Sequence, residues 1–236
     1  MKLSILVPVY NEENTVENLI RSLLQIKGKG VIEDIEIIAV NDCSTDKTPE
    51  ILDKLENEGL ITLLNHEKNM GKGAAVRTAI NGATGDYTVF QDADLEYDPQ
   101  DIVKMSEIAE EKGLDVLYGS RFFANRTSPL GKFHYLVNKF LTNLSNLFTG
   151  LKLTDMETCY KMFRTDIIKK ITINENRFGI EPELTAKMAR LVKESNLKIE
   201  EIPISYSPRK HHEGKKIGIK DGIRAVYIIF KYGFLR

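Results

Sequence analysis

Strand-like and helix-like segments alternate through the first half of the chain, and this alternation limits the possible folds more than any single motif. Short apolar runs typical of buried strands occupy residues 3–9, 35–40, 61–64, 87–90 and 115–118. Helix-like segments follow the first four runs, around residues 16–24, 48–58, 73–83 and 101–111. This order predicts an α/β fold, with a mostly parallel central sheet covered by helices on both faces.

The second half keeps helices and strands but loses the regular alternation. Helical patterns cover residues 130–148, 181–194 and 220–232, and strand-like patterns cover 160–163 and 198–206. No repeat, low-complexity tract or linker divides the chain. We therefore expect a single domain over residues 1–236, with an irregular second half built around a site.

Composition excludes several classes of protein. The chain has 236 residues, 42% of them hydrophobic and 28% charged, as in ordinary soluble domains. Its formal net charge of −1 offers no general attraction for nucleic acid. Cys43 and Cys159 form no disulfide framework, which favours a reducing, cytoplasmic compartment. We expect neither a signal peptide nor an integral membrane anchor, because the longest apolar stretch is far below the roughly 20 residues that a span needs.

The segment Gln91-Asp92-Ala93-Asp94 follows directly after a strand-like run. In open α/β sheets, ligands bind beyond the carboxyl ends of the strands. Paired carboxylates there are hard oxygen ligands that suit Mg²⁺ or Mn²⁺ carrying the phosphates of a substrate. A chance turn is the alternative. We interpret the segment as a sign of an enzyme that acts on a diphosphate-containing substrate.

Two other strand ends carry residues suited to a nucleotide. Tyr10 and Glu12, in the segment that begins at Pro8, could stack on a base and hold a ribose, although Asn11 could equally be a helix cap. Asp42 follows the second strand and could accept hydrogen bonds from a nucleobase or from ribose hydroxyls. The polar residues 44–46 behind it could simply start a helix.

A glycine turn precedes the third helix at Gly71, Lys72 and Gly73. It is not a P-loop, because Lys72 is followed by glycine rather than by serine or threonine. It could still bring backbone and Lys72 close to an anion at the start of a helix. No GxGxxG follows the first strand, which argues against a dinucleotide dehydrogenase.

Two charged segments lie in the irregular half. Asp155 and Glu157 either belong to a solvated loop or face the site, where one could act as a general base or position a metal-bound sugar. Arg209, Lys215 and Lys216 belong to a basic run that is either solvated surface or a mobile clamp on phosphates.

Taken in order, these motifs resemble family-two glycosyltransferases with the GT-A nucleotide-diphospho-sugar transferase fold. The closer similarity is to the polyprenyl-phosphate branch, which includes dolichol-phosphate mannose synthases and bactoprenol- or dolichyl-phosphate glucosyltransferases. The resemblance covers nearly the whole chain. It implies inverting transfer of a hexose from a nucleotide diphosphate sugar to dolichyl or undecaprenyl phosphate. UDP-glucose and GDP-mannose are the leading candidates for the donor, and Mg²⁺ or Mn²⁺ is the expected metal.

The resemblance also implies roles for individual residues. Residues 1–120 would bind the nucleotide sugar and residues 121–236 the acceptor. Asp92, Asp94 and Glu96 would hold the metal, and Asp94, Arg121 and Asp155 are the expected catalytic residues, with Arg121 on the acceptor phosphate. The expected nucleotide-binding residues are Pro8, Tyr10, Glu12, Asp42, Gly71, Lys72 and Asp92, joined by Arg209, Lys215 and Lys216 on a mobile loop.

Some alternatives stay open. Asp155 could position a group as well as move a proton, because a phosphate acceptor is already largely ionised at neutral pH. Many mannose synthases have Ser-Gly near Thr158 and Cys159, which puts mannose in doubt. A transferase that acts on a sugar or protein hydroxyl, or an inactive nucleotide-sugar-binding protein, would carry many of the same motifs.

The last helix predicts peripheral contact with the cytoplasmic face of a membrane. From Lys220 onward, one face can carry apolar side chains, and nearby cations can meet lipid headgroups. The apolar residues are Ile223, Val226, Tyr227, Phe230 and Phe234, and the cations are Lys220, Arg224, Lys231 and Arg236. Alternatively this stripe packs on the sheet, and the long helix that contains His134 and Asn138 forms the lipid-facing wall.

Overall fold

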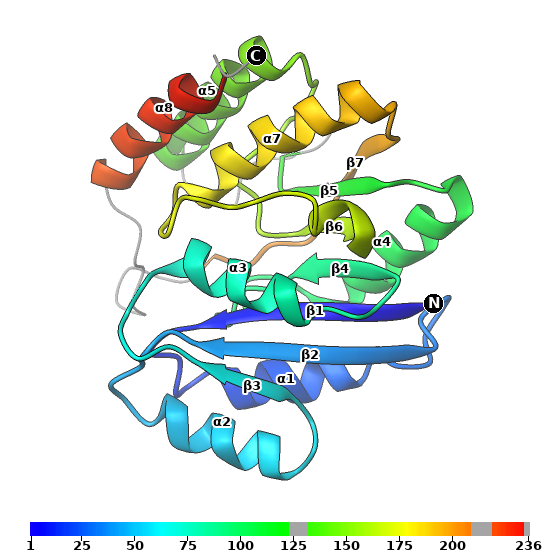
Figure 1. Cartoon of the computed structure of the whole chain (residues 1–236), viewed down its shortest axis with the longest axis vertical. Coiled ribbons are helices and arrows are strands. Elements are labelled where there is room, and N and C mark those ends of the chain that lie inside the picture. The colour runs from blue at the N-terminus through cyan, green and yellow to red at the C-terminus, as the bar shows by residue number, and fades with distance from the viewer. Residues whose placement is uncertain (123–131, 209–218, 234–236) are drawn as a thin grey trace.

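The strands pair into one seven-stranded sheet, in the order β3-β2-β1-β4-β6-β5-β7 (Figure 1). The computed structural model describes residues 1–122, 132–208 and 219–233. The strands are β1 (Lys2–Val9), β2 (Asp34–Asn41), β3 (Thr62–Asn65), β4 (Tyr87–Phe90), β5 (Val116–Ser120), β6 (Lys161–Arg164) and β7 (Ile199–Pro203). Only β6 runs against its neighbours β4 and β5, so the prediction of a mostly parallel sheet is confirmed.

The helices cover both faces of the sheet. They are α1 (Val16–Leu24), α2 (Thr48–Asn57), α3 (Lys72–Gly82), α4 (Pro99–Lys112), α5 (Lys132–Thr149), α6 (Thr165–Ile168), α7 (Ile180–Ser195) and α8 (Ile219–Gly233). In Figure 1, α3 and α7 cross in front of the sheet, while α1 and α4 lie behind it. The predicted helices all form, and within the described residues only the four-residue α6 is an addition.

Local sequence explains where these elements begin and end. The apolar residues of α1 recur every three or four positions, and Val16, Leu19, Ile20 and Leu23 are fully buried. Asp98 accepts a hydrogen bond from Gln100 N at 2.9 Å and caps α4, as its sequence predicts. After α4, Gly113 takes the left-handed conformation that ends a helix.

The C-terminal helix packs on other helices. Ala225 and Ile229 of α8 form a small apolar cluster with Leu141 of α5 and with Met156. The ring centroids of Phe148 and Phe230 lie 5.2 Å apart at the same contact. In the predicted stripe, Val226 and Phe230 contact this helical cluster while Ile223 and Tyr227 stay exposed, so the described part of the stripe does not pack on the sheet; Phe234 lies outside the described residues.

Apolar side chains remain exposed on the outer faces of α5 and α8. The exposed fraction is 63% for Leu136 and 58% for Phe140 on α5, and 68% for Ile223 and 64% for Tyr227 on α8. Within the described ranges, no helix is both long and apolar enough to cross a bilayer.

Two of the cations expected on α8 have protein partners. Arg224 donates to Glu175 Oε2 at 2.8 Å, and Lys231 donates to Glu175 Oε1 at 2.9 Å. Glu175 precedes α7, so the two ion pairs attach α8 to the body of the protein. Although burial alone would raise the pKa of Glu175, the hydrogen bonds from Arg224 and Lys231 lower it.

Candidate active site

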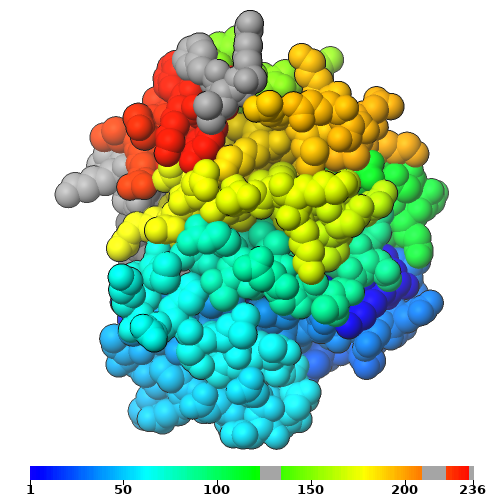
Figure 2. All heavy atoms as spheres, viewed as in Figure 1, coloured from blue at the N-terminus to red at the C-terminus, as the bar shows by residue number. Residues whose placement is uncertain are grey.

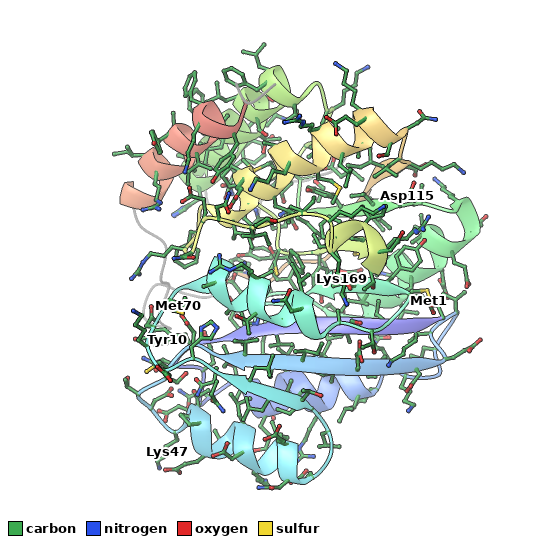
Figure 3. The ribbon with its side chains drawn as sticks, in the orientation of Figure 1. Met1, Tyr10, Lys47, Met70, Asp115 and Lys169 are labelled. Atoms are coloured by element: carbon green, nitrogen blue, oxygen red, sulfur yellow. The ribbon has the colours of Figure 1, made fainter. Side chains whose placement is uncertain are left out.

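The parallel strands β1 to β4 end at one edge of the sheet, and most of the polar motifs follow these ends. Tyr10 and Met70, from loops far apart in the sequence, lie at this edge in Figure 3. Pro8 is the next-to-last residue of β1 and is half-buried, as is Tyr10. The motifs that follow the strand ends therefore lie along one edge of the sheet, as expected. The groups to which their side chains bond differ from one motif to the next.

The loops after β1 and β2 hold each other in place. Asn11 adopts a φ of 51° and accepts a hydrogen bond from Thr45 N at 2.8 Å, while its own N–H donates to Ser44 Oγ at 3.0 Å. The backbone N–H of Glu12 donates to Thr48 Oγ1 at 2.8 Å. Asn11 is therefore not a cap of α1, and the polar residues 44–46 do more than start a helix.

Asp42 organises the loop that leads into α3. Its Oδ1 accepts a hydrogen bond from Met70 N at 2.8 Å and lies 2.7 Å from His66 Nδ1, and its Oδ2 accepts from Gly71 N at 2.6 Å. The side chain is almost fully buried. Contact of Asp42 with a nucleobase or ribose stays a prediction. His66, which sequence reasoning did not single out, bridges Asp42 and Thr78 Oγ1.

The glycines at the start of α3 make room for another loop. Gly71 has a φ of 95°, and a Cβ there would lie 2.5 Å from the carbonyl oxygen of Asn176. A Cβ on Gly73 would collide with the carbonyl oxygen of Glu175. Figure 2 shows the segment before α7 lying directly on α3. The glycine turn is thus explained by close packing within the protein.

Four charged side chains form what we call the lysine cluster: Lys72, Asp92, Lys161 and Glu181. Lys72 Nζ lies 2.8 and 3.1 Å from the two carboxylate oxygens of Asp92 and 3.2 Å from Glu181 Oε1. Glu181 also bonds the fully buried Lys161. Burial alone would lower the pKa of Lys72, but the carboxylate of Asp92 raises it well above its usual value. The cluster fixes Asp92 at the end of β4.

Glu181 and Lys161 were missed by sequence reasoning. An acid in the first turn of a helix is common for electrostatic reasons, so Glu181 did not stand out. A lysine inside an apolar strand was a usable signal, because a buried ammonium needs a partner. That signal points to Lys161, although it does not say which acid lies opposite.

Asp94 and Glu96 follow Asp92 in a tight turn, where Leu95 has a φ of 59°. Glu96 N donates to Asp94 Oδ1 at 3.3 Å, and the hydroxyl of Tyr206 donates to Glu96 Oε2 at 2.5 Å. Burial and the hydrogen bond to Glu96 both raise the pKa of Tyr206. The second half of the chain thus reaches the turn that follows β4.

The oxygen donors of this turn suit a hard divalent cation by their chemistry. In this structure Asp92 contacts Lys72, and Glu96 contacts Tyr206. Nowhere in the described residues do three or more His, Cys, Asp or Glu side chains gather closely enough to hold a metal ion.

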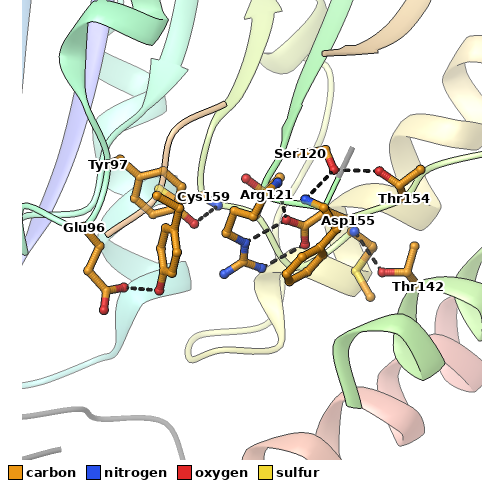
Figure 4. A network of polar contacts seen from close by, with 12 residues as sticks. Glu96, Tyr97, Ser120, Arg121, Thr142, Thr154, Asp155 and Cys159 are labelled. Carbon is orange, nitrogen blue, oxygen red and sulfur yellow. Dashed lines mark hydrogen bonds and ion pairs between the residues drawn. The ribbon is translucent and has the colours of Figure 1, made fainter. Parts of the chain in front are cut away.

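Arg121 and Asp155 form what we call the arginine pair (Figure 4). Arg121 donates from Nε to Asp155 Oδ2 at 2.7 Å and from Nη2 to Oδ1 at 2.8 Å, and its backbone N–H adds a third bond at 3.0 Å. Their side chains are 8% and 0% exposed. Both oxygens of Asp155 are thus engaged, which favours a positioning role over proton transfer.

The arginine pair is held by its surroundings. The guanidinium carbon of Arg121 lies 5.1 Å from the ring centre of Tyr206 and 5.3 Å from that of Phe122. Glu201 of β7 accepts hydrogen bonds from the backbone N–H groups of Thr154 and Asp155 at 2.8 to 3.0 Å. Glu201 was also missed, since its partners lie more than 40 residues away.

Glu157 is the least satisfied acid near the site. Its Oε1 is buried and has no hydrogen-bond partner in the described part of the protein, and the same holds for Thr158 Oγ1. Other atoms of Glu157 remain partly exposed. Burial, reinforced by the nearby charge of Glu181, raises the pKa of Glu157 to about 7.

The basic run predicted to bind phosphates lies outside the described residues, with its three site residues Arg209, Lys215 and Lys216.

Comparison with solved structures identifies the fold. The glucosyl-3-phosphoglycerate synthase of Mycobacterium tuberculosis, solved with uridine diphosphate, superposes with a TM-score of 0.73. The match covers 98% of this chain and 80% of that one, at 16% identity. The same enzyme with Mn²⁺, UDP-glucose and glycerol 3-phosphate gives a TM-score of 0.72 at 16% identity, over 98% of this chain and 79% of that one. The expected GT-A fold is confirmed.

Curated relatives extend over most of the chain. The dodecaprenyl-phosphate galacturonate synthase of Rhizobium johnstonii is 31% identical over 229 residues, which cover 96% of this chain and 64% of that protein. The dolichol-phosphate mannosyltransferase of Pyrococcus furiosus is 27% identical over 238 residues, covering 98% and 64%. The chain spans between 34% and 64% of the length of the first curated relatives it matches.

The motifs at the strand ends, the GT-A fold and these relatives agree with a direct family match. The family model described as "Glycosyl transferase family 2" matches residues 4–172, which include most of β1, all of β2 to β6, the arginine pair and three of the four residues of the lysine cluster. This chain therefore belongs to glycosyl transferase family 2.

Proposed function

We propose that this chain is the catalytic domain of an inverting glycosyltransferase that moves a hexose from a nucleotide diphosphate sugar to a polyprenyl phosphate. The observation that carries the proposal is the buried arginine pair, which holds a guanidinium beside the acidic turn after β4. The names of the relatives from Rhizobium johnstonii and Pyrococcus furiosus support a polyprenyl-phosphate acceptor.

The donor would bind at the ends of β1, β2 and β4. Pro8, Tyr10, Glu12 and Asp42 are proposed for the nucleoside. For the diphosphate we propose Lys72 and the start of α3 at Gly71, because helix N-termini favour anions. The donor diphosphate would also be bound by Arg209, Lys215 and Lys216.

Asp92, Asp94 and Glu96 would hold Mg²⁺ or Mn²⁺. When bound, such an ion neutralises the charge that develops on the departing nucleoside diphosphate. Glu96 would have to release Tyr206 to take part, and Asp92 would share its oxygens with Lys72. Asp94→Asn should therefore reduce turnover strongly while the protein stays folded, and unchanged turnover at saturating metal would remove Asp94 from the mechanism.

The acceptor phosphate would bind Arg121. A guanidinium has five N–H donors, and Asp155 takes two of them, so donors remain for a phosphate oxygen. A phosphate oxygen would attack the anomeric carbon as the nucleoside diphosphate leaves with the electron pair of the broken bond. Because the second pKa of a phosphate monoester is about 6, the acceptor already carries the needed charge at neutral pH. Asp155 then acts as a positioning residue.

Contact with a membrane would bring the enzyme to its acceptor. The exposed apolar side chains of α5 and α8 support peripheral contact, with the apolar groups at the lipid headgroup boundary. A polyprenyl phosphate presents its phosphate at the same boundary. We place this contact at the cytoplasmic face, where nucleotide sugars and reduced cysteines would both be found.

A transfer assay tests the function directly. The chain would be incubated with Mg²⁺ or Mn²⁺, a panel of radiolabelled UDP- and GDP-hexoses, and either polyprenyl phosphate or the matching unphosphorylated polyprenol. We expect label in the lipid extract with the phosphate and none with the alcohol. Equal labelling of both lipids, or labelling only of a sugar or protein hydroxyl, would contradict the proposal.

A further inference from the structure

Glu157 has a buried oxygen that the described protein does not satisfy. Buried polar atoms in folded proteins nearly always have a hydrogen-bond partner, so an orphan atom calls for an explanation. Thr158 Oγ1 is a second orphan, but Thr158 is fully buried, whereas Glu157 is only partly buried as a residue. Of the two residues, Glu157 is therefore the one that still contacts the surface.

The carboxyl group of Glu157 is close enough to both charged groups of the site to feel their charges. It interacts electrostatically with Glu181 and Lys161 of the lysine cluster and with Arg121 and Asp155 of the arginine pair. The lysine cluster holds Asp92, on the proposed donor side, and the arginine pair is the proposed acceptor side. The transferred sugar would lie between the leaving diphosphate and the attacking phosphate, and Glu157 is the partly buried acid that interacts with both sides.

The chemistry of this position favours a hydroxyl-bearing ligand. Lys161 is bonded to Glu181 and Arg121 to Asp155, so neither cation is committed to Glu157. A carboxylate only accepts hydrogen bonds, and a hexose hydroxyl is a neutral donor that fits beside these established ion pairs. The raised pKa of Glu157, about 7, is compatible, because a hydroxyl can also accept from the protonated acid.

We propose that Glu157 binds a hydroxyl group of the transferred sugar and thereby helps to determine which sugar the enzyme accepts. This inference rests on the proposed function. It makes Glu157 a specificity-determining residue of the donor site, distinct from the groups that hold the nucleotide, the metal and the acceptor phosphate.

Calorimetric titration of the full chain with Mn²⁺ tests this role. UDP and GDP would be compared with their hexose conjugates, including UDP-glucose and GDP-mannose. The ratio of the two dissociation constants isolates the contribution of the sugar. In Glu157→Ala we expect this contribution to fall roughly tenfold or more, while the affinity for the free diphosphate stays within about twofold.

Two variants serve as matched controls. Thr158→Val removes the neighbouring orphan hydroxyl of a fully buried residue, and Glu33→Gln changes an acid that is 88% exposed at the opposite end of β1 and β2. In both variants, the ratio of the two dissociation constants should equal that of the wild type. Glu157→Gln, which retains an acceptor oxygen, should lose less than Glu157→Ala.

The possible results distinguish a failure of this inference from a failure of the proposed function on which it rests. A wild-type chain that binds neither UDP nor GDP would refute the proposed function and the inference together. Binding of the diphosphates with no gain from any hexose, or an equal loss for free and conjugated diphosphate in Glu157→Ala, would refute the inference alone. Unchanged donor binding with lost turnover would make Glu157 a proton acceptor and would also overturn it.

Discussion

Arg121 and Asp155 show how a single buried ion pair can shape the site. Their side chains are almost fully removed from water, so each charge depends on the other for its stabilisation. A phosphate that approaches this guanidinium meets a group whose orientation is already fixed. The ordering of Arg121 is thus completed during folding and need not accompany each binding event.

Breaking the arginine pair should destabilise the fold. Arg121→Ala leaves the Asp155 carboxylate buried without its partner, and we expect a loss of about 3–5 kcal/mol in the free energy of unfolding. The double variant Arg121→Met/Asp155→Leu should lose less than the sum of the single changes, because no orphan charge remains. Urea denaturation measures both quantities. A loss below about 1 kcal/mol in Arg121→Ala would mean that the pair is not buried as described.

Glu157 should make stability depend on pH in a predictable direction. Its pKa is about 7 in the folded protein and 4.5 for the ordinary group, so folding favours the protonated form. The stabilisation is complete below pH 4.5 and is lost as the pH rises through 7. Relative to Glu157→Gln, the wild type should therefore lose on the order of 2 kcal/mol between pH 4.5 and pH 8.

Denaturant titrations of wild type and Glu157→Gln at several pH values measure this difference. The expected loss is smaller than the full pKa shift would give, because Glu157 is only partly buried as a residue. Glu33→Gln serves as the control, since its acid is exposed. A difference that stays constant from pH 4.5 to pH 8 would show that Glu157 ionises as in the unfolded chain.

At the scale of helices and strands, the sequence was a good guide wherever periodicity carries the information. The alternation of apolar runs predicted β1 to β5, and the spacing of Val16, Leu19 and Leu23 predicted α1. The four residues of α6 are too few to show a period. The reversed direction of β6 was not predicted, because strand direction follows from the path of the chain.

Contacts between distant elements were the part that sequence could not supply. Lys161 and Glu181 are 20 residues apart, and Glu201 is 46 residues from the Asp155 backbone that it holds. Each lies in an element whose own pattern looks ordinary. The residue types of the site were therefore recognisable, while the network that positions them was not.

The junction of α3 with the segment before α7 should tolerate no side chain at Gly73. A Cβ there collides with the backbone of Glu175, so Gly73→Ala must displace one of the two elements. We expect a loss of about 1–3 kcal/mol, as for other overpacked positions. Gly82→Ala is the matched control in the same helix, because the nearest atom to its Cβ would be Ile38 Cδ1 at 3.4 Å.

Thermal unfolding of the two glycine variants measures the effect. Gly82→Ala should be neutral or slightly stabilising, since alanine is the better helix former. If Gly73→Ala were as stable as Gly82→Ala, the close approach of residues 175–177 to α3 would be wrong.

At the scale of the whole molecule, α5 and α8 give one side of the protein an apolar surface. Leu136 and Phe140 belong to α5, and Ile223 and Tyr227 belong to α8, so two helices can contribute to membrane contact. Removing α8 would be a poor test, because its inner face is buried against α5 and α7. Changes confined to the exposed side chains avoid that difficulty.

Polar substitutions on the two helices should weaken binding to lipid without unfolding the protein. We expect Leu136→Ser/Phe140→Ser and Ile223→Ser/Tyr227→Ser each to reduce cosedimentation with anionic liposomes, at an unchanged melting temperature. Reduced cosedimentation of only one of the two double variants would identify the helix that makes the contact. Unchanged sedimentation of both pairs, and of the four together, would rule out this surface as the site of membrane contact.

The central claim is that Arg121 binds the phosphate of the acceptor. Steady-state kinetics of Arg121→Lys test this claim most directly. Lysine keeps the positive charge but cannot form the bidentate hydrogen bonds that arginine makes with Asp155. Arg190→Lys, whose arginine is exposed on α7 and paired with Glu194, serves as the control. We predict that Arg121→Lys raises KM for polyprenyl phosphate at least tenfold, with KM for the nucleotide sugar within about twofold of the wild type. An unchanged KM for polyprenyl phosphate, or a rise confined to the nucleotide sugar, would contradict the claim.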